Sequence, residues 1–237
     1  MPIRPSACLL VLSAFLSSAH AADAVDKAAP AVPIPADVVV APGPSGYIAA
    51  RIGAAFGART DFDALGTSVD TTFEPGFMGS VALGAALPTG TAISWRAEAE
   101  LGYLILDVDG HEVAGVGAFS GSGATGEADA TYGLANAYLD YELGTITPYI
   151  GAGIGVSSVT KSNFGTAPTG ILLDDDEVGL AWQIGAGASY AFSNDWSIEL
   201  GYRYLDVGAE GVTAVDGTRS DTATRSHQVQ IGIRRRF

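Results

Sequence analysis

A period of two in polarity is the feature that most constrains this chain. From Gly46 onward, eight segments place apolar residues on one parity and small or polar residues on the other. In residues 93–105 the odd positions are apolar or aromatic, whereas Arg96, Glu98 and Glu100 occupy even positions. Because successive side chains of a strand point to opposite faces, this pattern predicts strands that separate two different environments.

The connections between these segments alternate in length. We place the strands near residues 47–57, 77–87, 93–105, 135–143, 149–156, 180–192, 196–204 and 228–237. Residues 88–91, 144–147 and 193–195 form tight turns, whereas residues 58–76, 107–130, 160–177 and 206–224 form four long loops. Short turns on one side and long loops on the other are typical of bacterial outer-membrane barrels. The sequence therefore predicts an all-β fold, an eight-stranded antiparallel transmembrane up-and-down β-barrel.

The first residues have the features of a secretory signal. A basic start at Arg4 and an apolar run over residues 7–16 precede the small-residue ending Ala19-His20-Ala21. The apolar run is too short for a bilayer core that needs roughly 20 residues, so we expect cleavage after Ala21 rather than a membrane anchor. Residues 1–21 are then the signal peptide, residues 22–45 a flexible periplasmic leader rich in Ala and Pro, and residues 46–237 the barrel.

Ten ionisable residues on the polar parity decide which face is inside. A soluble barrel also alternates, but its apolar face points inward. Here the polar parity carries equal numbers of basic and acidic residues in a chain of net charge −14, and all the basic ones are arginine. A confined interior favours such balance because an unpaired buried charge costs several kcal/mol. We expect a lumen filled by an ion-pair network of Arg51, Arg96, Glu98, Glu100, Asp140, Glu142, Glu199, Arg203, Arg234 and Arg236.

Aromatic residues and overall composition support the same orientation. Twelve aromatic side chains fall on the apolar parity, mostly near strand ends, as two interfacial girdles would require. The acidic charge argues against nucleic acid as a partner. The only cysteine, Cys8, lies in the signal segment, so the processed chain holds no disulfide or thiolate metal site.

Several motifs resemble those of a known family. They are residues 95–103 (WRAEAELGY), 147–153 (TPYIGAG), 183–187 (QIGAG), 201–204 (GYRY) and 232–237 (GIRRRF). Over residues 46–237 the chain resembles small eight-stranded barrels of OmpA/OmpX type, and more narrowly the 25- and 31-kilodalton immunogenic surface antigens of alphaproteobacteria, which are porin-like. The resemblance implies that Phe237 is the C-terminal signal read by the barrel-assembly machinery. Arg235 departs from the pattern, which usually has an aromatic residue there.

Other candidate sites are weaker. Asp174, Asp175, Asp176 and Glu177 could hold a divalent cation, but they lack the spacing of a calcium loop, and we expect a solvated acidic run. Ser226 and His227 are adjacent and would face opposite sides of a strand, which disfavours a catalytic pair. The sequence gives equally little support to haem ligation by His111 or His227. The sequence predicts neither a metal nor a cofactor.

These observations leave three hypotheses on function. The leading one is a non-enzymatic barrel that contributes to envelope integrity and exposes acidic loops. The four predicted loops hold 17 of the 26 acidic residues and three basic ones, so cation-bridged contact with lipopolysaccharide is expected. The second hypothesis is a narrow porin-like channel for small solutes or ions. The third is a lipid-modifying enzyme.

Overall fold

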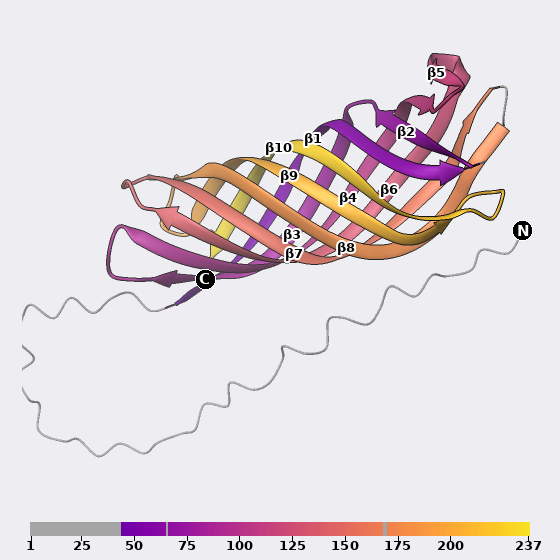
Figure 1. Cartoon of the computed structure of the whole chain (residues 1–237). Helices are drawn as coiled ribbons and strands as arrows, with labels where there is room; N and C mark the ends of the chain where they lie inside the picture. Colours follow the sequence, from indigo (N-terminus) through magenta and orange to yellow (C-terminus); the bar gives the residue numbers. More distant parts are fainter. Residues whose placement is uncertain (1–43, 65, 168–169) are drawn as a thin grey trace, which may run out of the picture. The chain divides into compact units, whose positions relative to one another are not determined.

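A computed structural model describes residues 44–64, 66–167 and 170–237. The predicted signal peptide and almost all of the predicted leader lie outside these residues. The described part contains ten strands and one short 3-10 helix (Figure 1). Their bounds are β1 Ser45–Ala64, β2 Thr67–Phe73, β3 Gly76–Pro88, β4 Ile93–Val113, β5 Gly117–Ser120, η1 Gly121–Gly123, β6 Ala124–Tyr141, β7 Ile146–Thr166, β8 Gly170–Ala191, β9 Trp196–Thr213 and β10 Arg219–Arg236. None of the described residues forms a helix long and apolar enough to cross a membrane.

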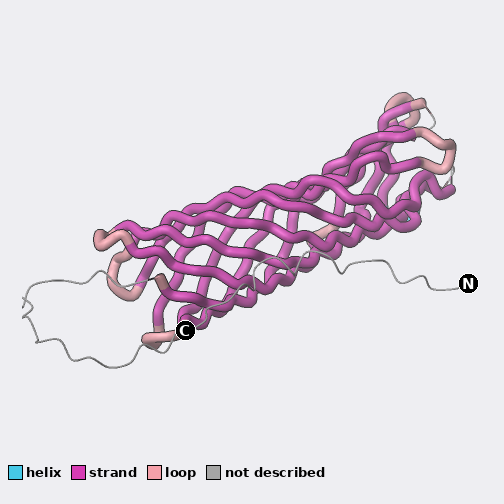
Figure 2. The backbone as a smooth tube through the Cα atoms, turned by 90° about the horizontal axis from the view of Figure 1, so that it is seen from below, coloured by secondary structure: helices cyan, strands magenta, loops and turns pink. Residues whose placement is uncertain are grey.

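The strands close into an antiparallel barrel with eight positions around its wall. Neighbours pair in the order β1, β3, β4, β6, β7, β8, β9 and β10, and β10 returns to β1 from Tyr47↔Arg236 to Arg59↔Arg225. Figure 2 shows the strands winding obliquely around one cylinder. The predicted barrel is therefore confirmed, although the described residues form ten strands instead of the eight predicted.

The two additional strands arise from an interruption and a short flanking ribbon. β2 and β3 occupy one wall position, because both pair with β1 on one side and β4 on the other. Glu74 and Pro75 separate them, and proline has no N–H to donate to a ladder. β5 pairs only with the end of β4.

The four long segments predicted as loops are mostly strand, which corrects that prediction. β1 continues to Ala64, β4 to Val113, β7 to Thr166 and β9 to Thr213. The wall therefore extends well beyond the part that the sequence assigns to the membrane. We call this part, made of the described residues within 58–76, 107–130, 160–177 and 206–224, the outer extension. It lies at the end opposite the tight turns (Figure 1).

Polarity inverts where the outer extension begins. Along β4, Trp95 and Leu101 face outward and are about half exposed, whereas Arg96 is buried inside. Farther along the same strand the inward Leu106 is buried and the outward Asp107 is exposed. Apolar-out, polar-in residues suit lipid, and polar-out, apolar-in residues suit water. The sequence pattern thus marks the level at which the barrel leaves the membrane.

The outer extension has its own apolar core. Buried residues from β1 to β4 and from β6 to β9 form one hydrophobic cluster inside the wall, and Met78 and Leu205 continue it into the adjoining part of the barrel. Phe164 lies at its centre, with its ring centroid 6.1 Å from Phe62, 6.0 Å from Phe73 and 5.7 Å from His111. This part of the molecule is stabilised as a small soluble barrel is, by burial of apolar area.

Aromatic side chains bracket the lipid-facing band. Trp95, Tyr141 and Trp196 lie near the tight turns, and Phe77 and Tyr202 lie near the outer extension, all with outward side chains 37–51% exposed. The chain end lies at the tight-turn side, since the Phe237 N–H donates to Gly46 O at 2.9 Å. The aromatic residues thus form the two interfacial levels expected of a membrane barrel.

Candidate functional site in the barrel interior

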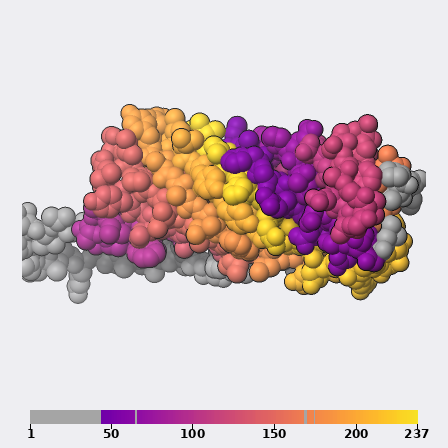
Figure 3. Space-filling model, turned by 45° about the horizontal axis from the view of Figure 1, so that its top comes forward, coloured from indigo at the N-terminus to yellow at the C-terminus, as the bar shows by residue number. Residues whose placement is uncertain are grey.

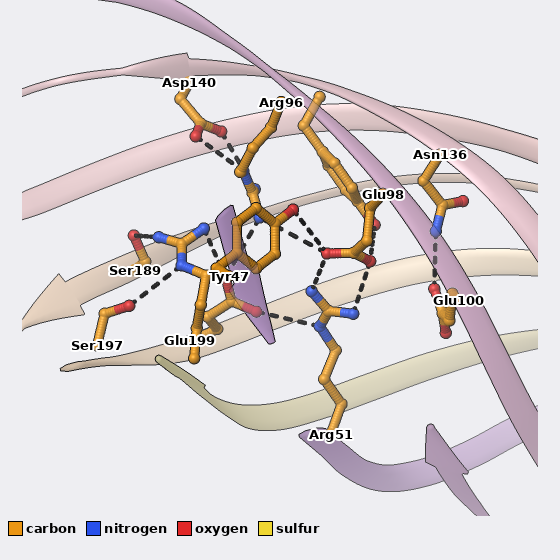
Figure 4. Close-up of polar contacts among 12 residues, drawn as sticks. Tyr47, Arg51, Arg96, Glu98, Glu100, Asn136, Asp140, Ser189, Ser197 and Glu199 are labelled. Carbon is orange, nitrogen blue, oxygen red and sulfur yellow. Dashed lines mark hydrogen bonds and ion pairs between the residues drawn. The ribbon is translucent and has the colours of Figure 1, made fainter. Parts of the chain in front are cut away.

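The lower lumen contains a buried cluster of charges. Eight of the ten predicted lumen residues are inward and no more than 9% exposed, and they carry four positive and four negative charges: Arg51, Arg96, Glu98, Glu100, Asp140, Glu199, Arg203 and Arg234. Strands β1, β4, β6, β9 and β10 supply them. Figure 4 shows most of this cluster, with the side chains converging from different strands. We call it the lumen network.

Glu98 and Arg51 form a bidentate pair. Arg51 Nη1 and Nη2 donate to the two carboxylate oxygens of Glu98, each at 2.8 Å. The Tyr47 hydroxyl donates to Glu98 Oε2 at 2.9 Å. Parallel N–H···O bonds fix the orientation of both groups, so this pair ties β1 to β4 across the lumen.

Glu199 on β9 is the acceptor that connects three arginines. Arg51 Nε lies 3.1 Å from Glu199 Oε2, while Arg96 Nη1 and Arg234 Nη1 lie 3.4 and 3.1 Å from Oε1. Arg234 also donates to the hydroxyls of Ser189 and Ser197, each at 3.2 Å. One carboxylate therefore links β1, β4 and β10 through the middle of the barrel.

Arg96 is held between a carboxylate and aromatic rings. Its Nε and Nη2 donate to Asp140 at 2.8 and 3.1 Å. Its guanidinium carbon lies 4.4 Å from the Tyr138 ring centroid and 5.1 Å from that of Tyr149. Such contacts favour a desolvated arginine over a desolvated lysine, as the absence of lysine from the predicted set indicates.

A second group surrounds Arg203, closer to the outer extension. Arg203 Nη1 donates to Glu100 Oε1 at 2.7 Å, and its Nε donates to Gln228 at 2.7 Å. Arg203 also bonds the Tyr132 hydroxyl. Asn136 donates to the other oxygen of Glu100 at 2.9 Å. Glu100 is thus satisfied on both oxygens although it is 4% exposed.

Side chains fill this lumen instead of lining a water channel. Arg51, Glu199 and Arg203 have exposed fractions of 4%, 2% and 2%, whereas side chains around an open pore would be accessible. A cavity beside Arg203 and Tyr149 has a volume of about 10 Å³, enough for about one water molecule. Above the network lies the apolar core of the outer extension.

Glu142 and Arg236 do not belong to the lumen network. Both are exposed at the tight-turn end, Glu142 just beyond β6 and Arg236 as the last residue of β10. Glu142 accepts a hydrogen bond from Ser94 Oγ at 3.1 Å, and Arg236 makes no ion pair with a residue that the structure describes. Their parity is that of the lumen residues, but at a strand end that face meets solvent. Alternation predicts the face of a side chain and not its depth.

Several tyrosines that contact the lumen network are absent from the predicted set of lumen residues. Tyr47 and Tyr132 are inward and fully buried, and each lies directly across from a glycine, Gly84 and Gly102 respectively. A Cβ at either glycine would come within 2.2 Å of the opposing ring. A signal was present, because glycines alternate with apolar residues in the predicted strands and leave room for bulky cross-strand neighbours.

The weaker candidates have ordinary structural roles. In the acidic run on β8, Asp175 accepts a hydrogen bond from the Thr213 N–H at 2.7 Å, and no group of three or more potential metal ligands occurs among the described residues. The side chain of Asp174 lies outside them. Ser226 is fully buried, whereas the ring of its neighbour His227 bonds the Tyr202 hydroxyl at 2.6 Å.

His111 is enclosed in the outer extension. Its Nδ1 lies 2.8 Å from Thr71 Oγ1 and its Nε2 lies 2.9 Å from Thr125 O, so both ring nitrogens have protein partners. Burial lowers the pKa of His111, and the bond to the Thr125 carbonyl partly opposes this effect. The ring packs with Phe164, with the two centroids 5.7 Å apart.

The family follows from comparison with known proteins. A model of the outer membrane protein beta-barrel domain matches residues 7–237. The chain belongs to this family. It is therefore a protein of the bacterial outer membrane, as the alternation and the exposed apolar band predict.

The chain is also similar to individual proteins, at low sequence identity. This barrel is 27% identical over 241 residues to the 31 kDa outer-membrane immunogenic protein of Brucella melitensis, covering 96% of this chain and 97% of the relative. It is 31% identical over 115 residues to the outer membrane protein PagN of Salmonella typhimurium, covering 42% of this chain and 46% of that one. Among solved structures, Neisserial surface protein A aligns with a TM-score of 0.48 at 18% identity, covering 83% of this chain and 100% of that one.

Proposed function

We propose that this barrel is a closed, non-enzymatic element of the outer membrane that holds an acidic, sheet-built surface above the lipid. The observation that carries the proposal is the lumen network. Four arginines and four carboxylates neutralise one another there, at exposed fractions of at most 9%. A channel needs polar groups that exchange partners with a passing solute, whereas these groups are committed to each other.

The outer surface supports the second half of the proposal. Outward residues of the extension are rich in carboxylates, among them Asp61, Asp70, Asp107, Glu112 and Asp221, all exposed. The strands beneath them have a packed core, so these charges have fixed positions relative to one another. Divalent cations could bridge such a surface to the phosphates of neighbouring lipopolysaccharide, a partner class that we propose on charge grounds.

Conductance separates this function from transport. The refolded barrel is placed in a planar lipid bilayer, and we expect no steady open events. A barrel with an open, water-filled lumen, reconstituted in the same bilayer, serves as the positive control. Steady conductance of the unmodified barrel that disappears when Arg96 is changed to a bulkier Trp would favour a channel instead.

The absence of enzymatic activity is a separate part of the proposal. Lipid A incubated with the pure barrel should keep its mass, because His227 bonds a tyrosine hydroxyl and the neighbouring Ser226 is buried on the opposite face. Loss of an acyl chain that depends on His227 would refute this part.

We also propose that Phe237 takes part in recognition by the barrel-assembly machinery. The ring follows β10 and is 74% exposed at the tight-turn end, so it is accessible to a partner. A Phe237→Ser variant should insert more slowly in cells yet refold normally from urea into detergent. Normal insertion in cells would contradict this role.

A further inference from the structure

The outward face of β1, β9 and β10 combines two features that the proposed function does not use. One is a cluster of basic and aromatic side chains at the level where polarity inverts. The other is an apolar groove directly below it, lined by these strands and the neighbouring β3. We call the first the basic patch and define it as Arg59, Arg225 and His227, with the flanking rings of Phe56, Tyr202 and Tyr204.

The basic patch begins with two arginines that face each other across strands. Arg59 on β1 and Arg225 on β10 are register partners, and both are exposed. Like charges in directly opposed positions destabilise a sheet unless something neutralises them. Arg59 forms no ion pair with any residue that the structure describes. This pair occurs on an outer surface whose other charges are mainly acidic.

Protein carboxylates satisfy Arg225 only in part. Its Nε donates to Asp206 at 3.3 Å, and its Nη1 lies 3.9 Å from Asp61, beyond hydrogen-bond length. The Arg225 side chain is 45% exposed, and such surface pairs contribute little. A guanidinium has five N–H donors, so Arg225 can bind an anion without losing Asp206.

A β-bulge arranges the aromatic part of the patch. The register of β1 against β10 shifts between Phe56 and Arg59, and Gly57 in the shift has a φ of 57°. The His227 ring is then surrounded by rings, with centroid distances of 5.9 Å to Phe56, 6.1 Å to Tyr202 and 5.3 Å to Tyr204. These rings belong to the outer interfacial level, where lipid headgroups lie.

The groove continues from the patch into the apolar band. It has a volume of about 330 Å³, and its lining includes Ile52, Phe77, Leu200, Val229 and Ile231. Val229 and Ile231 follow His227 along β10, and Ile52 precedes Phe56 along β1. In Figure 3, β1 (indigo) and β10 (yellow) lie side by side on the visible face. An apolar groove of this size suits an acyl chain.

We propose that this face binds one phosphorylated, acylated glycolipid of the outer leaflet. Its phosphate would lie between Arg59 and Arg225, its sugar against the aromatic rings, and one acyl chain in the groove. The inference deepens the proposed function, on which it rests, by assigning the lipid partner to particular residues. Guanidinium groups suit phosphate because they donate paired hydrogen bonds.

Lipid retention measured by native mass spectrometry tests the proposal. The full refolded barrel in detergent is mixed with bisphosphorylated lipid A, with the same lipid after removal of its phosphates, or with lipid A plus equimolar inorganic phosphate. We expect retention of the phosphorylated lipid, weaker retention of the dephosphorylated one, and no displacement by phosphate. Equal retention of the two lipids, or displacement by free phosphate, would overturn the proposal.

Matched variants locate the site. Arg59→Gln/Arg225→Gln should weaken retention about tenfold or more, because it removes two charge-assisted contacts. The control Arg219→Gln changes another exposed arginine of β10 and should bind as the parent does. Val229→Phe should obstruct the groove, whereas Val156→Phe changes a lipid-facing residue of β7 outside it.

Folding of the variants and the proposed function are each measured separately from lipid retention. Gel mobility before and after boiling confirms that each variant is folded. If the double arginine variant retains the phosphorylated lipid as well as the parent does, the proposed lipid site is wrong. Since these arginines lie outside the lumen, that result would leave the conductance test of the closed barrel unaffected.

Discussion

Arg203→Met should destabilise the barrel by leaving Glu100 buried without its cation. Arg203 Nη1 lies 2.7 Å from Glu100 Oε1, and the two side chains are 3% and 1% exposed. Removing one partner of a buried pair costs roughly 3–5 kcal/mol. Glu100 keeps the Asn136 amide at 2.9 Å, so we expect a loss near the lower bound, about 3 kcal/mol. Methionine keeps most of the stem volume, so the loss reports charge more than cavity.

Urea unfolding of the barrel in detergent micelles measures this loss. Trp95, Trp182 and Trp196 all face outward, so their fluorescence reports separation from the apolar surroundings. The matched control is Arg236→Met, which changes an exposed arginine at the end of β10 and should alter stability by less than about 0.5 kcal/mol.

A second variant tests the cause. Arg203→Met/Glu100→Gln removes both charges, and it should recover at least about half of the loss because no unpaired ion stays buried. Equal stability of Arg203→Met and Arg236→Met would contradict a stabilising role for the buried ion pair. A double variant less stable than Arg203→Met would contradict it as well.

Two further predictions concern the outer extension and the wall. Lys161 in the extension is 1% exposed beside the Thr222 hydroxyl, and burial lowers its pKa to about 8 from an ordinary 10.5. Because the unfolded chain then binds the proton to higher pH than the folded chain, stability should rise between pH 8 and 10.5 by up to about 3 kcal/mol. Limited proteolysis of the extension in urea across this range should show the rise, and Lys161→Met should abolish it and resist protease better at neutral pH. In the wall, Gly155→Ala should lower the free energy of unfolding by about 1–3 kcal/mol, because the added Cβ would lie 1.9 Å from Gly133 O. The control Gly133→Ala should be tolerated, because its Cβ would have no neighbour nearer than 4.0 Å. Equal urea midpoints of the two variants would contradict this prediction.

The sequence carried most of the information about the membrane-spanning part. Alternation predicts the face of each strand residue, so Arg51, Glu98 and Glu199 could be assigned to the lumen before their partners were known. Sign balance could predict that they pair, although not which carboxylate would accept from three arginines. That depends on strand stagger, which alternation does not encode. Alternation also does not predict whether an inward-facing residue lies deep in the lumen or at its end, since Glu142 and Arg236 lie exposed at strand ends.

The outer extension was missed because its pattern inverts. Beyond Ile105 the outward positions of β4 become Asp107 and Asp109, while the inward side chain changes from charged, as at Glu100, to apolar, as at Leu106. If apolar residues are expected to face outward along the whole strand, the inverted stretch looks like an irregular, acidic loop. The basic patch could not be predicted from the sequence for a different reason. Arg59 and Arg225 lie opposite each other because the bulge at Gly57 shifts the register of the two strands.

The outer extension is hydrogen-bonded sheet instead of loop, and this has a consequence for how other molecules contact the protein. Surface polypeptide held in a hydrogen-bonded ladder has little freedom outside its hairpin tips, such as the turns at Gly115 and Gly217. An antibody raised against the native cell surface would then contact residues brought together from adjacent ribbons, and not a continuous peptide. We expect such an antibody to lose its epitope when the protein is boiled, and sequence insertions to be accepted only at the tips.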